Sequence, residues 1–257
     1  MNFIIDALKI IFLLGILVTI HEGGHFLIAK LCKVRVNQFS IGFGKIIFEK
    51  QMKETKYQIR MIPLGGFVSM EGETEESSEK DSFSKANIWK KIAIVSAGAI
   101  VNIIFGILIY FLVVSFMGIQ FSNPEKDTFI NRIYYGGIQT KEFIFSLGIS
   151  IKQLFTGNVL PDQMTGIVGI SSIVSKTNGI IEYLYIMSVI SVSLGVTNLL
   201  PIPALDGGKL LILLIELIRR KPMKIETEAK IQLIGFSVLI ALSIYVTYND
   251  IVRVIKM

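Results

Sequence analysis

The sequence is poor in charged residues, cysteine and histidine. Only 18% of its 257 residues are charged, whereas roughly a quarter are charged in a typical soluble domain. Its one cysteine, Cys32, excludes an internal disulfide. Hydrophobic residues make up 52% of the chain, and the mean hydropathy is +0.62. This apolar excess is larger than a soluble core of this length needs, so it indicates a protein in contact with lipid.

The charge that is present is mostly positive. The net charge is +6 and the sequence pI is about 9.3. A basic chain can bind nucleic acid, but here the Lys and Arg residues flank apolar runs. That is where the positive-inside rule places them in membrane proteins. We therefore expect a lipid bilayer as a partner, and no nucleic acid.

Four apolar segments are long enough to cross a bilayer, for which a helix needs about 20 apolar residues. The HEGGH sequence follows the first apolar run directly, with no cleavage site between them, so we interpret this run as a retained membrane helix and not a signal peptide. The third segment is interrupted by two prolines, Pro201 and Pro203. The predicted segments are 3–31, 92–117, 181–218 with the broken helix, and 231–248.

The connections between these segments differ in character. Residues 34–70 contain short β-prone pieces separated by glycines, which predicts a membrane-associated β-hairpin region. Residues 71–85 are acidic and rich in serine, as in an exposed loop. The longer connection over 118–180 contains an amphipathic stretch, Lys141–Phe155, typical of a surface helix. The predicted fold is thus a single domain over 1–257, an all-α polytopic membrane protein with a small β-hairpin region after the first helix.

The distribution of Lys and Arg predicts the orientation of the chain. Twelve of them lie between Lys30 and Lys91, and five more lie between Arg219 and Lys230. Both loops should therefore be cytoplasmic, with the 118–180 connection and both termini outside. This places the HEGGH sequence near the cytoplasmic side of the membrane.

The HEGGH sequence, residues 21–25, contains both histidines of the chain. Residues four apart share one face of a helix, so His21 and His25 can ligate the same zinc ion. The glutamate between them, Glu22, can then take a proton from water. Ionisable residues are costly in an apolar helix unless they serve a function. The alternative is an interfacial helix end whose polar side chains reach the lipid headgroups.

A catalytic zinc needs a third protein ligand and an open position. Asp206 is the candidate, because it follows a helix broken by Pro201 and Pro203 and precedes two glycines. Irregular backbone at membrane depth is tolerated where it is buried in protein or lines a cavity. The alternative is a proline kink with a buried aspartate paired to Lys209.

Together the two motifs resemble the site-2 protease family of intramembrane metalloproteases, and within it the bacterial regulator of sigma-E protease branch. HExxH is present as His21–His25, and the N-x-x-P-x-P-x-L-D-G pattern is complete over 198–207. Tyr57–Val68 is similar to the membrane-associated hairpin of that branch, and Gly98–Asn102 to its G-x-x-x-N element. The resemblance covers nearly the whole chain.

The resemblance implies a zinc metalloendopeptidase of the bacterial inner membrane, with Zn²⁺ as cofactor and no small-molecule cofactor. Its substrates would be single-pass membrane proteins cleaved in their transmembrane segments, such as anti-sigma factors or remnant signal peptides. The implied roles are general base for Glu22, metal ligand for His21, His25 and Asp206, and substrate contact for Asn198, Pro201, Pro203, Asn102, Gly65 and Gly66.

One departure from this branch concerns the external connection. The branch carries one or two PDZ domains between its second and third membrane helices. The stretch from Gly118 to about Tyr135 is far too short for one, so we predict that a PDZ domain is lacking. This leaves the catalytic positions unchanged, although it removes the size filter that a PDZ domain would give.

Two other functions compete with proteolysis. A transporter or ion-binding protein could use the same His and Asp side chains, because broken helices also occur in transporters. Four helices and no internal repeat argue against alternating access, and such a protein would have no task for Glu22. A non-catalytic scaffold is the other possibility, and the complete set of catalytic positions argues against it.

Overall fold

The computed structural model describes residues 2–75, 77–118, 127–156 and 166–256. The predicted external connection therefore has two stretches, 119–126 and 157–165, that lie outside the described residues. The helices are α1 (Asn2–Leu31), α2 (Ile88–Val113), α3 (Phe129–Phe155), α4 (Ile167–Ser175), α5 (Ile180–Asn198), α6 (Asp206–Arg219) and α7 (Ile225–Lys256), with a π-helical turn, η1 (Val114–Gly118), after α2. The strands are β1 (Val36–Met52) and β2 (Thr55–Met70).

Four helices of the described residues are long and apolar enough to cross a membrane. They cover Ile4–Leu31, Ile88–Met117, Ile180–Asn198 and Ile225–Val252. Only 11% to 33% of the most apolar stretch of each helix is buried inside the protein. Most of this apolar surface must therefore be covered by a solvent other than water. This confirms the predicted fold class of four membrane helices with a small sheet after the first.

The chain divides into two compact units. The first contains Met1–Ile103 and Ser193–Ile240, and the second contains Ile104–Val192 and Ala241–Met257. All of the predicted site residues belong to the first unit, which is described first.

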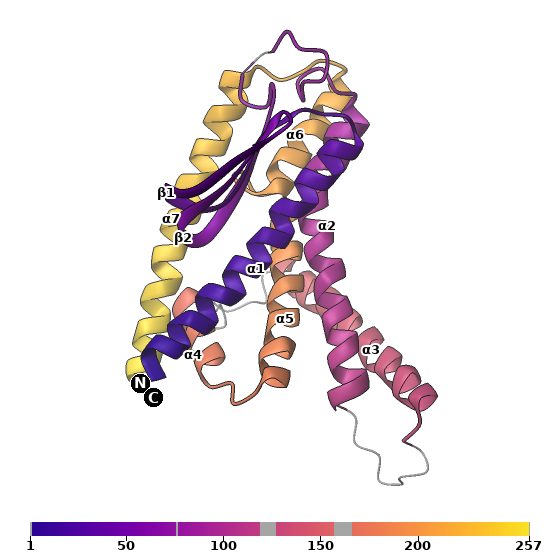
Figure 1. The fold of residues 1–257 in the computed structure, drawn as a ribbon, viewed down its shortest axis with the longest axis vertical. Coiled ribbons are helices and arrows are strands. Elements are labelled where there is room, and N and C mark those ends of the chain that lie inside the picture. Colours follow the sequence, from indigo (N-terminus) through magenta and orange to yellow (C-terminus); the bar gives the residue numbers. More distant parts are fainter. Residues whose placement is uncertain (1, 76, 119–126, 157–165, 257) are drawn as a thin grey trace. The chain divides into compact units, whose positions relative to one another are not determined.

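In the first unit, α1 crosses α2 closely because glycine and alanine meet there. A side chain at Gly24 would place its Cβ 2.7 Å from the Ala97 carbonyl oxygen, so only glycine permits this approach. The end of α1, the start of α2, the end of α6 and the start of α7 lie at one end of this unit, at the top of Figure 1. A small core sits there, formed by Ala29, Val34, Val36, Met70, Phe83, Ile94, Val95 and Leu213.

The two strands form an antiparallel sheet with an irregular register. Residues 38–41 of β1 have partners both in the first part of β2, residues 56–59, and in its last part, residues 66–69. The sheet is therefore folded on itself, and the positive φ angles of Gly42 (+89°) and Gly44 (+81°) mark the bend in β1.

The second unit shows two differences from the sequence-based expectations. The helix predicted over 141–155 begins at Phe129, where Thr128 caps it by accepting a hydrogen bond from the Asn131 amide. A short helix, α4, was not predicted. Asp250 is 1% exposed and accepts hydrogen bonds from the Gly166 and Gly169 amides at 2.9 Å each, so this carboxylate caps the start of α4.

Candidate metal centre

The two histidines of the HEGGH sequence lie on the same face of α1. Their Nε2 atoms are 3.2 Å apart, and the two rings meet edge to face with centroids 4.8 Å apart. The side chains of His21 and His25 are only 11% and 12% exposed. An uninterrupted helix is enough to bring them together, because the i, i+4 spacing of α1 stacks one imidazole above the other.

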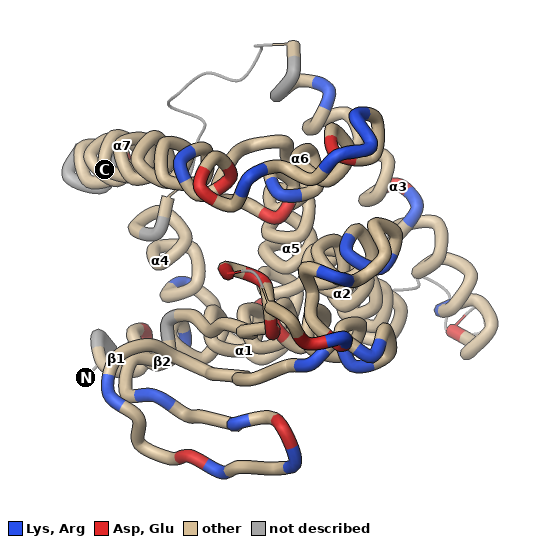
Figure 2. The backbone as a smooth tube through the Cα atoms, turned by 90° about the horizontal axis from the view of Figure 1, so that it is seen from above, with Lys and Arg blue, Asp and Glu red and all other residues tan. Residues whose placement is uncertain are grey.

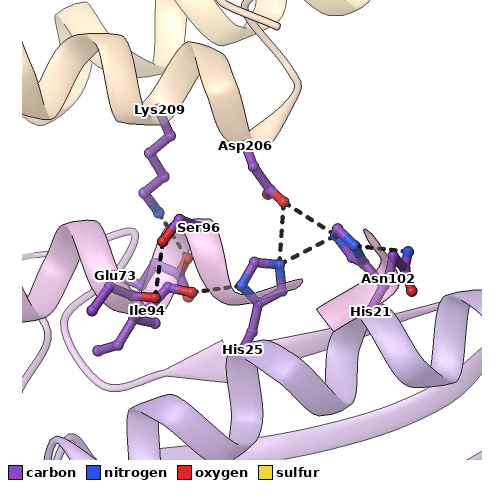
Figure 3. A network of polar contacts seen from close by, with 9 residues as sticks. His21, His25, Glu73, Ile94, Ser96, Asn102, Asp206 and Lys209 are labelled. Atoms are coloured by element: carbon purple, nitrogen blue, oxygen red, sulfur yellow. Dashed lines mark hydrogen bonds and ion pairs between the residues drawn. The ribbon is translucent and has the colours of Figure 1, made fainter. Parts of the chain in front are cut away.

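Asp206 approaches the same point from a different part of the chain. It is the first residue of α6, and its Oδ2 lies 3.2 Å from His21 Nε2 and 3.4 Å from His25 Nε2 (Figure 3). Its carboxylate also sits where the amide groups at a helix start favour negative charge. His21 and His25 are four positions apart in the sequence, whereas Asp206 follows His25 by 181 positions. The structure brings all three side chains together.

The second ring nitrogen of each histidine has a partner on α2. His25 Nδ1 donates to the Ile94 carbonyl oxygen at 2.8 Å, which leaves the Nε2 lone pair directed at the cluster. His21 Nδ1 lies 3.3 Å from the Asn102 side-chain amide, and Asn102 is fully buried. Partners of this kind fix the ring orientation and the tautomer of metal-binding histidines.

The three ligand atoms fit a tetrahedral zinc site. Nitrogen and oxygen ligands at about 2.0–2.1 Å from a tetrahedral zinc lie about 3.3 Å from one another, which the three distances of 3.2, 3.2 and 3.4 Å match. Asp206 Oδ2 is buried and has no hydrogen-bond donor among the described residues. A buried carboxylate oxygen facing two imidazole nitrogens is satisfied by a cation. Three protein ligands leave a fourth position open, as catalytic zinc requires.

Small residues on α2 make room for the two imidazoles. A Cβ on Gly98 would lie 2.3 Å from His25 Nε2 and 2.8 Å from His21 Cε1. Any side chain at this position would therefore displace the ligands. The G-x-x-x-N element noted in the sequence has two functions in the structure, since Gly98 admits the rings and Asn102 contacts one of them.

The loop before Asp206, residues 199–205, is irregular and tightly folded. Pro201 and Pro203 have no amide hydrogen to donate, and Ala204 has a positive φ of +76°. A Cβ on Gly207 would lie 2.1 Å from the Leu200 carbonyl oxygen, and one on Gly208 would lie 2.4 Å from that of Ile202. The two glycines after Asp206 therefore let α6 begin directly against the loop.

Lys209 does not pair with Asp206, so that alternative interpretation of the aspartate is wrong. Its Nζ lies 2.7 Å from Glu73 Oε1 in the acidic loop, and 4.9 Å from the centre of the Phe83 ring. The neighbouring Glu71 accepts hydrogen bonds from Asn37 and Ser77, which lower the pKa of its carboxyl group. The loop that looked exposed in the sequence is thus tied at Glu71 to β1 and at Glu73 to the helix that carries Asp206.

Glu22 lies on α1 at a point where strand β2 passes close to the helix. A Cβ on Gly66 would be 3.2 Å from Glu22 Cγ and 3.5 Å from Val18 Cγ1, so the absence of a side chain in β2 lets the strand cross the helix here. Gly65 has a φ of +146°, and a Cβ there would collide with the Phe43 ring. Both glycines predicted to contact substrate are therefore required by the local backbone.

Asn198, Pro201 and Pro203 contact none of the metal ligands in any interaction of the described residues. Asn198 ends α5 with a partly buried side chain, and Pro201 is exposed. Their roles in substrate contact stay predictions. Asn102 is 0% exposed and its side chain faces His21. In the structure it therefore holds the ring of a metal ligand in place.

Three contributors were missed by the sequence analysis. Gly98 was quoted only as part of a motif, Glu73 only as part of an acidic loop, and Gln232 on α7 not at all. Gln232 lines a cavity of 340 Å³ together with Glu73, Asp206 and Lys209. The G-x-x-x-N motif includes Gly98 without indicating its role, and no local pattern marks the roles of Glu73 and Gln232, because each of these residues meets a distant segment of the chain.

Comparison with known proteins identifies the family of this arrangement. The family model described as peptidase family M50 matches residues 9–242. The chain is 28% identical to "Putative zinc metalloprotease Cj1068" of Campylobacter jejuni, over 98% of this chain and 94% of that protein. It is 24% identical to "Regulator of sigma-W protease RasP" of Bacillus subtilis, over 98% of this chain and 99% of that protein.

The same relatives bear on one expectation from the sequence. The Campylobacter name describes a zinc metalloprotease and the Bacillus name a protease, which decides between a protease and a transporter in favour of the protease. The alignment with the Campylobacter protein spans 348 positions against the 257 residues of this chain. The relative therefore contains many residues without a counterpart in this chain, and the absence of a PDZ domain stays a prediction.

Proposed function

Because this chain belongs to peptidase family M50 and is a zinc metalloprotease of the membrane, we propose that it cleaves single-pass proteins within their transmembrane segments. The observation that carries the proposal is the convergence of His21, His25 and Asp206 in apolar, membrane-length surroundings. Remnant signal peptides and membrane-bound anti-sigma factors are the substrate types that suit this site.

The proposed chemistry divides between the metal and the side chains. Zinc, when bound, supplies a Lewis acid that lowers the pKa of water and polarises a carbonyl. His21 Nε2, His25 Nε2 and Asp206 Oδ2 would hold it, oriented by Ile94 and Asn102. Glu22 would accept the proton from water at its carboxylate and return it to the leaving amine. Transfer of this kind contributes about 10²–10⁴-fold to a rate.

Asn198 is the candidate for stabilising the oxyanion. It ends α5 just before the broken loop, and its side-chain amide is a hydrogen-bond donor. Removing one such donor costs about 3 kcal/mol of transition-state stabilisation in other hydrolases. We expect Asn198→Ala to lower turnover by about 10²-fold with zinc retained, whereas full turnover would remove this role.

The sheet supports a way of holding the substrate. A transmembrane helix hides its carbonyl groups in internal hydrogen bonds, so it must unwind before cleavage. We propose that the unwound segment adds as a strand to β2 within Tyr57–Val68. This is supported by the close approach of Gly66 to Glu22, which brings the strand backbone beside the proposed base.

Proline substitutions test strand addition. Successive amides of a strand point to opposite sides, so one of Phe67 and Val68 donates away from β1. Proline at that position should reduce cleavage while zinc content stays unchanged, because only a hydrogen bond to substrate is lost. Unchanged cleavage by both Phe67→Pro and Val68→Pro would contradict the proposal.

The charge distribution supports an orientation with the metal centre near the cytoplasmic side. Figure 2 shows Lys and Arg at the end of α1, at the start of α2 and around α6. His21 and His25 lie six to ten residues before the end of α1, which corresponds to roughly 9–15 Å along a helix. By the positive-inside rule, this end of the first unit would face the cytoplasm, with both chain termini outside.

The experiment that tests the function is cleavage of a tagged single-pass substrate by the purified protein in liposomes. Wild type and the exposed-site control Glu79→Gln should both produce the shorter fragment. Glu22→Gln should produce none and should still contain zinc. The same fragment from Glu22→Gln, or no fragment from zinc-loaded wild type across a panel of trimmed substrates, would overturn the proposal.

A further inference from the structure

The Asp206 ligand follows a loop, residues 199–205, whose internal backbone hydrogen bonds among the described residues run from the Ile202 amide to the Leu200 oxygen and from the Leu205 amide to the Ile202 oxygen. Pro201 and Pro203 remove two amide donors from residues 199–205, and Ala204 adopts a left-handed φ of +76° two residues before the ligand. A left-handed conformation is unfavourable for alanine, so the surrounding structure must impose it. The direction in which α6 starts, and hence the position of the Asp206 carboxylate, depends on this turn.

Helix α7 contacts the loop at this turn. The Ala204 amide donates a short hydrogen bond to the Gln232 side-chain oxygen, which joins residues 28 positions apart. Three residues further along, Gly235 is buried against Pro203, and a Cβ there would lie 2.3 Å from Pro203 Cβ. Residues three apart share a helix face, so one face of α7 both accepts the Ala204 amide and packs on the preceding proline.

A cavity adjoins both this loop and α7. It has a volume of 340 Å³, and its lining includes Ala204, Leu205, Asp206 and Gln232. Open space beside a loop means that few packed atoms resist its displacement in that direction. The hydrogen bond from the Ala204 amide to Gln232 therefore has a larger effect on the position of the loop than it would in a packed interior.

We propose that Gln232 is a positioning residue for the metal centre, which acts through the Ala204 amide to direct Asp206 toward His21 and His25. The inference rests on the proposed function, because it assigns a task to the loop only if Asp206 binds zinc. Gln232 is one of the residues that the sequence analysis did not mark, and it does not contact the metal ligands itself.

The proposal requires an acceptor at position 232, and this sets the choice of variants. Gln232→Met has a similar length and shape but no acceptor for the amide. Gln232→Glu keeps an oxygen in the same place and should restore the contact. Gln153→Met makes the same chemical change at an exposed position of α3 and serves as the control. If Gln232→Met does not fold, Gln232→Asn keeps the amide but withdraws it from Ala204.

The measurements are the zinc affinity, the visible spectrum of the cobalt-substituted protein, and the thermal midpoint of each variant. We expect Gln232→Met to lose about tenfold in zinc affinity, at the low end of the range for outer partners of metal ligands, and to show an altered cobalt spectrum. Gln232→Glu should remain within about threefold of wild type in the same measurement. Gln153→Met should match wild type.

Three results would overturn the inference. Wild-type zinc affinity and cobalt spectrum in Gln232→Met would show that the contact does not direct Asp206. A lower thermal midpoint with an unchanged spectrum would show a structural role only. Failure of Gln232→Glu to restore the spectrum would remove the acceptor assignment. Failure of the proposed function is distinguishable, because it would appear as wild type that yields no fragment or as Glu22→Gln that yields the same fragment, whereas Gln232 is tested by zinc affinity and the cobalt spectrum.

Discussion

The two halves of the metal centre are built in opposite ways. His21 and His25 lie on an unbroken helix, where the i, i+4 spacing alone sets the separation of their rings. Asp206 follows an irregular loop with two prolines and a left-handed alanine, and helix α7 contacts that loop at Ala204 and Pro203. Local geometry therefore positions one half, while contacts between distant segments position the other.

Because of this difference, substitutions in different parts of the chain should affect the two halves of the metal centre. The helical half should tolerate changes elsewhere in the chain as long as α1 forms, the space over Gly98 stays empty and the contacts with Ile94 and Asn102 remain. The loop half should respond to changes on α7 that contact neither metal nor substrate.

Removing a ligand from either half should have the same large effect. His25→Ala and Asp206→Ala each leave two protein ligands and an open site, so zinc should be lost and cleavage should fall below detection. Metal analysis of the purified variants after dialysis provides the measurement. If Asp206→Ala kept its zinc while His25→Ala lost it, the loop half would not belong to the centre.

Filling the space above the histidines should be nearly as damaging. Gly98→Ala puts a methyl group 2.3 Å from His25 Nε2, so the ring must move. We expect zinc affinity to fall by about 100-fold, the upper end for a change next to the ligands. Gly23→Ala is the matched control, because apart from its chain neighbours and the adjacent backbone of α1 no described atom lies within 4 Å of its added methyl group. Equal zinc affinity in the two variants would contradict the packing described.

A substitution on α7 that displaces the loop should have an intermediate effect on zinc affinity. Gly235→Ala brings a methyl group to 2.3 Å from Pro203 Cβ, which displaces the loop and not the histidines. Zinc affinity should fall by about tenfold. Gly137→Ala, at an open position of α3, provides the comparison. If Gly235→Ala lowered zinc affinity no more than Gly137→Ala, the contact of α7 with the loop would not be needed to position Asp206.

The smallest effect is expected at the ion pair between Glu73 and Lys209. Both side chains are 21% exposed, and partly exposed pairs contribute about 1 kcal/mol or less. Lys209→Gln should lower cleavage by less than about fivefold. The charge exchange Glu73→Lys with Lys209→Glu should recover part of the loss. A loss as large as that of Asp206→Ala would give Lys209 a direct part in the chemistry.

The same contrast explains how much the sequence could predict. The four membrane helices and the histidine pair were predictable, because hydropathy and helical spacing are local properties of the chain. Asp206 was also identified, since Pro201 and Pro203 mark the break beside it. The 129–140 part of α3 was missed, because the amphipathic pattern was recognised only from Lys141 onward.

The contacts that support the metal ligands could not be predicted from local sequence patterns. Gln232 meets Ala204 across 28 residues, and Gly98 meets His25 across 73. Asp250 lies two residues beyond the fourth predicted membrane segment, and it is buried as the cap of α4. Each depends on which segments become neighbours on folding, and periodicity within a segment carries no information about that.

The measurement that tests the central claim most directly is X-ray absorption at the zinc edge, on wild type and on Asp206→Ala. The two halves of the centre predict one zinc with two imidazole ligands and oxygen ligands at about 2.0–2.1 Å in wild type. Loss of zinc in Asp206→Ala would agree with this arrangement. A sulfur ligand, which could come only from Cys32 or a methionine, or a zinc unaffected by loss of Asp206, would contradict it.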